Sequence, residues 1–143
     1  LLPYRGTDYI FEVEKFSDLE GKTGPYLLYS TIRMKSLLNK AKEQGIEFNE
    51  VKALKGETEK DIVLTLLYLP DLLIKSVEAK SLNEIADYIY KLTSIYNKFY
   101  SEHKVLIEED KDLQESWLVL TNVVYKVNMI LLDVLGIKVP NKM

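Results

Sequence analysis

The sequence predicts an all-α protein, a bundle of four main helices with the second one broken at Pro70. Two observations predict this class. Apolar residues recur at steps of three and four over most of the chain, which is the period of an amphipathic helix. Glycine or proline stands where these runs begin and end. The chain shows no strand-rich or β-α-β pattern and no internal repeat, so neither a sheet protein nor a repeat array is expected.

The first predicted helix runs from Pro25 to about Gln44. Proline is tolerated in a first helical turn because its missing N–H has no intrahelical partner there. Gly45 follows the last periodic residue and ends the helix. Its beginning at Thr23-Gly24-Pro25 marks the start of the helical body.

The second predicted helix runs from Glu57 to about Lys80, with an apolar stripe at Ile62, Leu66 and Leu69. Pro70 breaks or kinks it, because proline removes a backbone donor and clashes with the preceding turn.

The third predicted helix extends to about His103, and Ser81 and Asn83 are its candidate caps. Its apolar stripe keeps steps of four and three, at Ile85, Ile89, Leu92, Tyr96 and Phe99. The fourth has the clearest rhythm and ends before Gly136. Its stripe is Leu113, Trp117, Leu120, Val124, Val127, Leu131 and Val134.

Residues 1–22 lack this helical rhythm, and alternating apolar positions predict a short extended piece or linker there. We therefore expect a leading segment over 1–22 and one helical domain over 23–143. The first residue is Leu1 rather than methionine, which suggests a chain that begins inside a longer reading frame.

Composition narrows the class further. With 143 residues and 47% hydrophobic content, the chain can bury one core without a staple. It has no cysteine and one histidine, His103, which excludes a disulfide framework, a thiolate zinc site and a histidine cluster. No run approaches the roughly 20 apolar residues of a membrane span, and no secretory signal is present. We expect a cytoplasmic protein that contacts neither membrane nor DNA and carries no metal or cofactor.

Enzymatic signatures are missing. The chain has no glycine-rich phosphate loop, no GxGxxG and no HExxH. The acidic run at residues 107–112 is typical of the beginning of a helix, where carboxylates favour the dipole, rather than of a metal cluster. Catalysis by this chain alone is not expected.

One helix face carries a mixture suited to single-stranded RNA. At about 100° per residue, a strip of the third helix beside its core stripe collects the following side chains. They are Tyr90, Thr93, Asn97, Tyr100 and Lys104. Aromatic rings can stack on bases, an amide can read a base edge and a cation can bind phosphate. Equally, tyrosines beside a core stripe can simply bury their rings against a neighbouring helix.

A second face, on the first helix, has the same ambiguity. It consists of Tyr26, Tyr29, Arg33, Ser36 and Lys40. We favour packing, and this face near the N-terminus could equally be the surface on which the body of a longer chain docks. The net charge of −3 provides no global attraction for nucleic acid, so any RNA contact depends on a local patch.

Three segments, in order, resemble the C-terminal domain of arginyl-tRNA synthetases. They are EGKTGPYLLYSTIRMKSLL, IADYIYKLTSIYNKFYSEHKVL and VNMILLDVLGIKVPNKM. This is the class I synthetase anticodon-binding domain named for an Asp-Ala-Leu-Arg motif. The resemblance implies a helical bundle that binds the anticodon stem-loop of arginine tRNA, while a separate catalytic domain binds ATP and arginine. By the same resemblance, the family's anticodon-contacting tyrosine falls on Tyr100, its terminal methionine falls on Met143, and Asn97 lies in the Asn-x-Phe-Tyr block.

The chain departs from the family pattern in three places. Leu28 stands where many members have glutamine, the Asp-Ala-Leu-Arg letters are not legible, and Asn141-Lys142 replaces the common Glu-Arg before the last methionine. Lys142 still supplies a cation for phosphate.

The resulting hypothesis is tRNA anticodon recognition, as the C-terminal domain of an arginine-tRNA ligase. Tyr100 stacks on a base, and Asn97 and the Met143 end donate or accept hydrogen bonds nearby. The candidate phosphate ligands are Lys98, Lys104, Lys138 and Lys142. Two alternatives stay open: a helical protein-interaction or scaffolding module, and the equivalent domain of another class I synthetase such as the cysteine enzyme.

Overall fold

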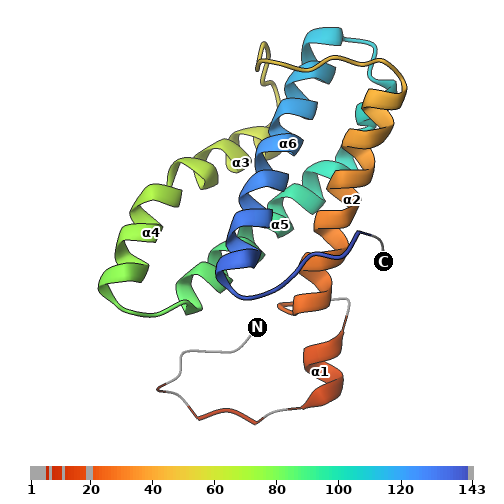
Figure 1. Cartoon of the computed structure of the whole chain (residues 1–143). Coiled ribbons are helices and arrows are strands. Elements are labelled where there is room, and N and C mark those ends of the chain that lie inside the picture. Colours follow the sequence, from red (N-terminus) through yellow and green to blue (C-terminus); the bar gives the residue numbers. More distant parts are fainter. Residues whose placement is uncertain (1–5, 7, 11, 19–20, 142–143) are drawn as a thin grey trace.

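The structure is a computed structural model that describes residues 6, 8–10, 12–18 and 21–141. Over these residues it is all-helical, as predicted. Four helical units pack together: α2 (Gly24–Glu43), the broken pair α3 (Glu57–Leu67) and α4 (Leu69–Glu78), α5 (Asn83–Glu102) and α6 (Lys111–Val134). A 3₁₀ turn, η1 (Val105–Ile107), joins α5 to α6. Figure 1 shows α2, α5 and α6 side by side, with α3 and α4 extending to the left.

Helix ends follow the local chemistry that the sequence suggested. The Thr23 side chain accepts from Tyr26 N at 3.2 Å and caps α2, with Pro25 in the first turn. Gly45 and Gly136, both at positive φ, follow α2 and α6 as predicted. The predicted break before Pro70 is confirmed: α3 ends at Leu67, and the proline lies in the first turn of α4.

Two local predictions were wrong. The leading segment contains a short helix, α1 (Val13–Ser17), where an extended piece was expected. Neither Ser81 nor Asn83 caps α5, because their side chains hydrogen-bond each other and Leu82 stands at the N-cap without a side-chain bond. The predicted division at residue 22 stays a prediction.

The core lies between α2, α5 and α6, and α3 closes one side. Its largest buried side chains include Tyr96 and Phe99 of α5, Met34 of α2 and Leu131 of α6. A polar contact crosses the middle: the Asn128 amide of α6 donates to Thr93 Oγ1 of α5 at 3.0 Å and to Thr31 Oγ1 of α2 at 3.3 Å. Buried amides need such partners, so this contact fixes how the three helices are aligned.

Among the described residues, α6 is the one helix long and apolar enough to cross a membrane, by length and composition alone. This finding differs from the expectation that no apolar run approaches the length of a membrane span. The core helix of a soluble protein passes the same test, and 44% of the most apolar window of α6 is buried inside the bundle.

Candidate nucleic-acid interface

The two polar helix faces singled out in the sequence meet across the contact between α2 and α5. Asn97 of α5 joins them. Its side-chain nitrogen donates to the Tyr26 hydroxyl at 2.8 Å and to Ser30 Oγ at 2.9 Å, both on α2. Its oxygen accepts from Arg33 Nη2. Both amide N–H groups are therefore occupied by α2, and a direct contact of Asn97 with a base stays a prediction.

Arg33 is the centre of this arrangement. Its guanidinium carbon lies 4.6 Å from the centroid of the Tyr100 ring and 5.7 Å from that of Tyr29. Asn97 fixes one end of the guanidinium. Arg33 Nε is buried and lacks a hydrogen-bond partner within the described part of the chain, so a ligand can reach this donor only if the side chains that cover it move.

The aromatic rings differ in exposure. Tyr29 is 49% exposed, and Tyr100 is half-buried. Tyr96, behind Tyr100 with ring centroids 6.2 Å apart, is fully buried, and this burial raises the pKa of its hydroxyl. The half-buried Tyr100 therefore contacts both the buried Tyr96 ring and the Arg33 guanidinium. Such a layer of ring and guanidinium can be extended by a nucleobase.

A small cavity of about 280 Å³ adjoins Tyr100 at the end of α5. Its lining includes Tyr100, His103, Lys104 and Leu106. The His103 ring stacks on Phe99 at 4.7 Å and meets the Trp117 ring edge-on at 4.5 Å, which holds this end of α5 on the core. Lys104 is exposed, so its ammonium can reach a phosphate beside the cavity.

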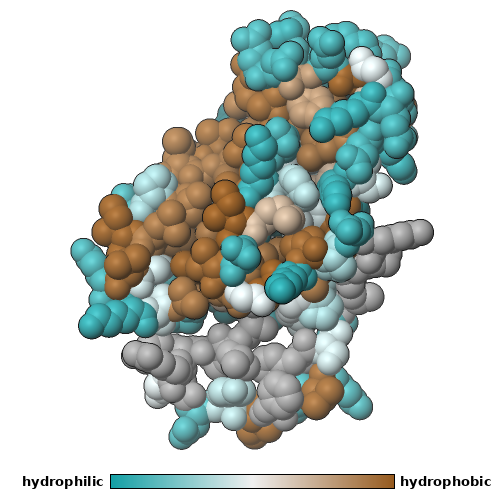
Figure 2. Space-filling model, in the orientation of Figure 1, coloured by the Kyte–Doolittle hydropathy of each residue, from teal (hydrophilic) through white to brown (hydrophobic). Residues whose placement is uncertain are grey.

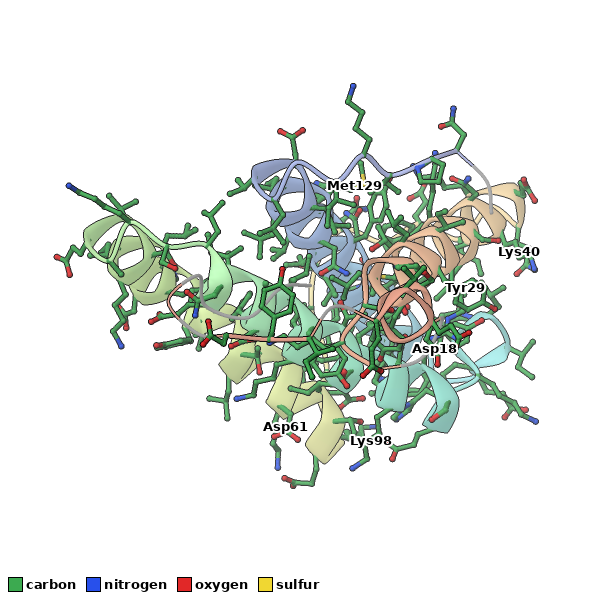
Figure 3. All side chains as sticks on the ribbon, turned by 90° about the horizontal axis from the view of Figure 1, so that it is seen from below. Asp18, Tyr29, Lys40, Asp61, Lys98 and Met129 are labelled. Atoms are coloured by element: carbon green, nitrogen blue, oxygen red, sulfur yellow. The ribbon has the colours of Figure 1, made fainter. Side chains whose placement is uncertain are left out.

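Not every predicted site residue converges here. Thr93 is buried against Asn128 and Tyr90 packs on Tyr26, 5.6 Å between centroids, so packing explains both. Lys98 lies about 160° around α5 from Tyr100. In Figure 3 it lies on the same side of the molecule as Asp61 and away from Tyr29.

The C-terminal segment passes α2, because Lys35 Nζ lies 3.3 Å from Asn141 Oδ1. Lys138 is exposed on this segment, with no contact that joins it to Tyr100. The predicted contacts Lys142 and Met143 lie outside the described residues.

Sequence reasoning underestimated Arg33 and Tyr29. The signal was present in their spacing of four on one helix face, but that face was interpreted as packing. Only the pairing of α2 with α5 shows that Arg33 covers the very tyrosine predicted from the other helix.

The model of the DALR anticodon binding domain family matches residues 27–143. The chain belongs to this family. It is similar to the arginine–tRNA ligase of Maricaulis maris, 36% identical over 140 residues, which are 98% of this chain and 24% of that protein. It is also similar to the arginine–tRNA ligase of Alkaliphilus oremlandii, 34% identical over 137 residues, which are 95% of this chain and 23% of that protein.

Solved structures agree. Arginyl-tRNA synthetase from Thermus thermophilus superposes with a TM-score of 0.77 at 27% identity, over 88% of this chain and 22% of that one. The enzyme from Plasmodium falciparum superposes with a TM-score of 0.82 at 23% identity, over 99% of this chain and 25% of that one, which supports the fold alone. The chain spans about a quarter of the length of the curated relatives it matches.

Proposed function

We propose that this DALR domain binds the anticodon loop of arginine tRNA. It would do so as one domain of a longer ligase, whose catalytic body binds ATP and arginine and performs the aminoacylation. The chain itself would need no cofactor and would work in the cytoplasm. The observation that carries the proposal is the Arg33 guanidinium placed 4.6 Å over the Tyr100 ring on a partly exposed surface. The family match and the arginine–tRNA ligase relatives support the choice of tRNA and of arginine.

The geometry gives the side chains of this surface different roles in binding RNA. Tyr29 and the Arg33–Tyr100 layer offer surfaces on which an unstacked base can lie. The guanidinium of the partly exposed Arg33 and the ammonium of the exposed Lys104 can bind phosphate or a base edge. Asn97 acts by holding Arg33 in place.

The test is fluorescence anisotropy at low salt with two stem-loops that differ only in the anticodon, one for arginine and one for another amino acid. We expect tighter binding of the arginine loop. Tyr100→Ala should weaken it by about 1–3 kcal/mol, the usual effect of losing one base–aromatic stack. Arg33→Lys should also weaken it, because lysine keeps the charge but loses the planar guanidinium. Lys126 is an exposed cation on α6, so Lys126→Ala is the matched control and should leave the affinity for the stem-loop unchanged.

Equal affinity for both loops, with Tyr100→Ala also unchanged, would refute recognition by this surface and favour the protein-interaction alternative. The cysteine-enzyme alternative has no support among the relatives reported above, which are ligases for arginine.

A further inference from the structure

Helix α6 carries a second apolar stripe outside the core. Its buried face includes Leu120, Val124 and Leu131. Beside that face, at steps of four, three and four, lie Val123, Val127, Ile130 and Val134. Ile130 is 63% exposed, Val134 46% and Val123 38%, while Val127 is half-buried. A surface helix normally has polar residues at such positions, and a helix apolar on more than one face is usually covered on more than one face.

Helices α3 and α4 carry further exposed apolar side chains. The exposed aliphatic side chains of α3 and α4 include Leu67 at 69%, Ile74 at 59% and Val77 at 77%. Figure 2 shows hydrophobic side chains gathered over α4 and the lower part of α6 on one side of the molecule. We call this the outer face, defined by Leu67, Ile74, Val77, Val123, Val127, Ile130 and Val134. Contiguous apolar surface of this kind on a soluble protein usually marks an interaction site.

The outer face is not the RNA surface. Figure 3 places Tyr29 and Lys40, both of α2, on the opposite side of the molecule from α4. Stacking of bases at Tyr29 and Tyr100 therefore leaves the outer face uncovered, and a protein seated on the outer face leaves Tyr29 accessible.

We infer that the outer face is the surface on which the catalytic body of a ligase-length chain packs, through an aliphatic helix face of that body. The inference rests on the proposed function. The length of the relatives indicates which protein covers the outer face. The matched part is 24% and 23% of the two ligases, so each is about four times as long as this chain and has a large body outside the matched domain. A body in the same chain is present at an effective concentration in the millimolar range, which a second copy of the domain would have to exceed.

The absence of cysteine in the chain allows a direct test. A single cysteine is placed at Ile130, by Ile130→Cys, and its reaction rate with a maleimide is followed by peptide mass spectrometry. The rate is measured in the isolated chain and in a fusion where this chain replaces the matching segment of the Maricaulis maris ligase. Val51→Cys is the matched control, since Val51 is 45% exposed on the loop that contacts the first turns of α6 at Glu115 and Ser116, about 20 Å along that helix from Ile130.

We expect Ile130→Cys to react at least about ten-fold more slowly in the fusion than in the isolated chain, and Val51→Cys to react at the same rate in both. Equal rates for Ile130→Cys in both would overturn the inference. So would slow labelling in the isolated chain together with a dimer in sedimentation, because a second copy would then cover the face. Protection of the isolated chain by phospholipid vesicles, without protection in the fusion, would assign the face to a membrane and also overturn it.

The same variants separate this inference from the proposed function. Ile130→Cys should retain the preference for the arginine stem-loop, because the outer face lies away from Tyr29. Loss of docking with intact RNA preference would refute only the inference. Intact docking without RNA preference would refute only the proposed function.

Discussion

Lys80 has a backbone conformation that most side chains avoid. Among the described residues it is the one non-glycine residue at positive φ, at 49°. It follows α4 in the place that Gly45 takes after α2 and Gly136 takes after α6. In all three, the next amide donates to a carbonyl five residues back: Ser81 N to Ser76 O at 3.1 Å, Ile46 N to Ala41 O at 2.9 Å, and Ile137 N to Leu132 O at 2.8 Å.

The Lys80→Gly variant should therefore be more stable. Removing the β-carbon relieves about 1–2 kcal/mol of left-handed strain, and the greater freedom of glycine in the unfolded chain offsets about 0.5–1 kcal/mol of that gain. We expect a net gain of roughly 0.5–1 kcal/mol, measured by urea unfolding. Gly136→Ala is the mirror test: a β-carbon there meets no atom within 4 Å, so any loss of stability comes from φ alone. A loss of stability in Lys80→Gly would contradict this account.

Single residues also show why the site could be predicted only in part. Tyr100 was found from its place on a helical strip and from the family resemblance. Arg33 was visible as a basic residue on another helix, but periodicity places residues only relative to their own helix. Which face of α2 meets which face of α5 depends on the packing of Thr31, Thr93 and Asn128 in the core, and no local pattern encodes that contact.

At the scale of the element, α3 is attached to α6 by one buried carboxylate. Glu59, 1% exposed, accepts from Lys55 N at 2.6 Å, from Gly56 N and from Trp117 Nε1 of α6. Two of these donors lie directly before α3, and the third is the indole of the chain's single tryptophan. No local pattern predicts the bond to Trp117, because it is a tertiary contact between α3 and α6.

Glu59→Gln should cost about 1–3 kcal/mol of stability, because an amide keeps the shape but turns a donor toward N–H groups that then lack an acceptor. Urea unfolding followed by Trp117 fluorescence measures the loss and reports on the indole directly. Glu57→Gln is the control on the same helix, with a side chain 85% exposed, and should change stability by less than about 0.5 kcal/mol. Equal effects of the two substitutions would show that the buried contact is unimportant.

The loop between α2 and α3 is held on α6 by a second carboxylate. Glu115 Oε1 accepts from Asn49 N at 2.9 Å and Glu50 N at 3.3 Å, and its other oxygen lies 2.5 Å from Lys52 Nζ. The Lys52 side chain first, and then these amides, lower the pKa of Glu115 from 4.5 to about 2. Ser116 Oγ adds two more bonds to the loop, from Lys52 N and Ala53 N.

This pKa shift predicts a pH dependence. A carboxyl whose pKa is lowered on folding contributes stability that is fully present above its unfolded pKa of about 4.5 and is lost as pH falls through its folded pKa of about 2. We expect the Asn49 and Glu50 amides to lose protection from hydrogen exchange between those pH values, after correction for intrinsic rates. In Glu115→Gln their protection should be lower at neutral pH and nearly independent of pH. Unchanged protection down to pH 2 in the parent protein would contradict the role of Glu115.

For the molecule as a whole, the regular parts were predictable and the relations between them were not. Helix periods and terminal glycines placed α2, α5 and α6 correctly, since these signals are local. The short α1 lacks a clear period. The apolar stripe of the outer face on α6 has the same sequence pattern as a core stripe, and only the packing shows which of its side chains are exposed. The four-three rhythm identifies a helix but does not tell a covered stripe from an exposed one.

The last prediction concerns charge. The chain carries a net charge of −3, so binding of RNA depends on the few cations beside Tyr100 rather than on a global field. Arg33, Lys104 and one further lysine would neutralise about three phosphates, and about 0.7 counterions are released per phosphate of a single strand. We expect log K to fall against log salt with a slope of about −2, measured by anisotropy with the arginine stem-loop from 50 to 200 mM KCl. Lys104→Ala should reduce that slope by about 0.7, whereas Lys126→Ala should not change it. A slope near zero would mean that phosphates contribute nothing, and the protein-interaction alternative would then explain the surface better.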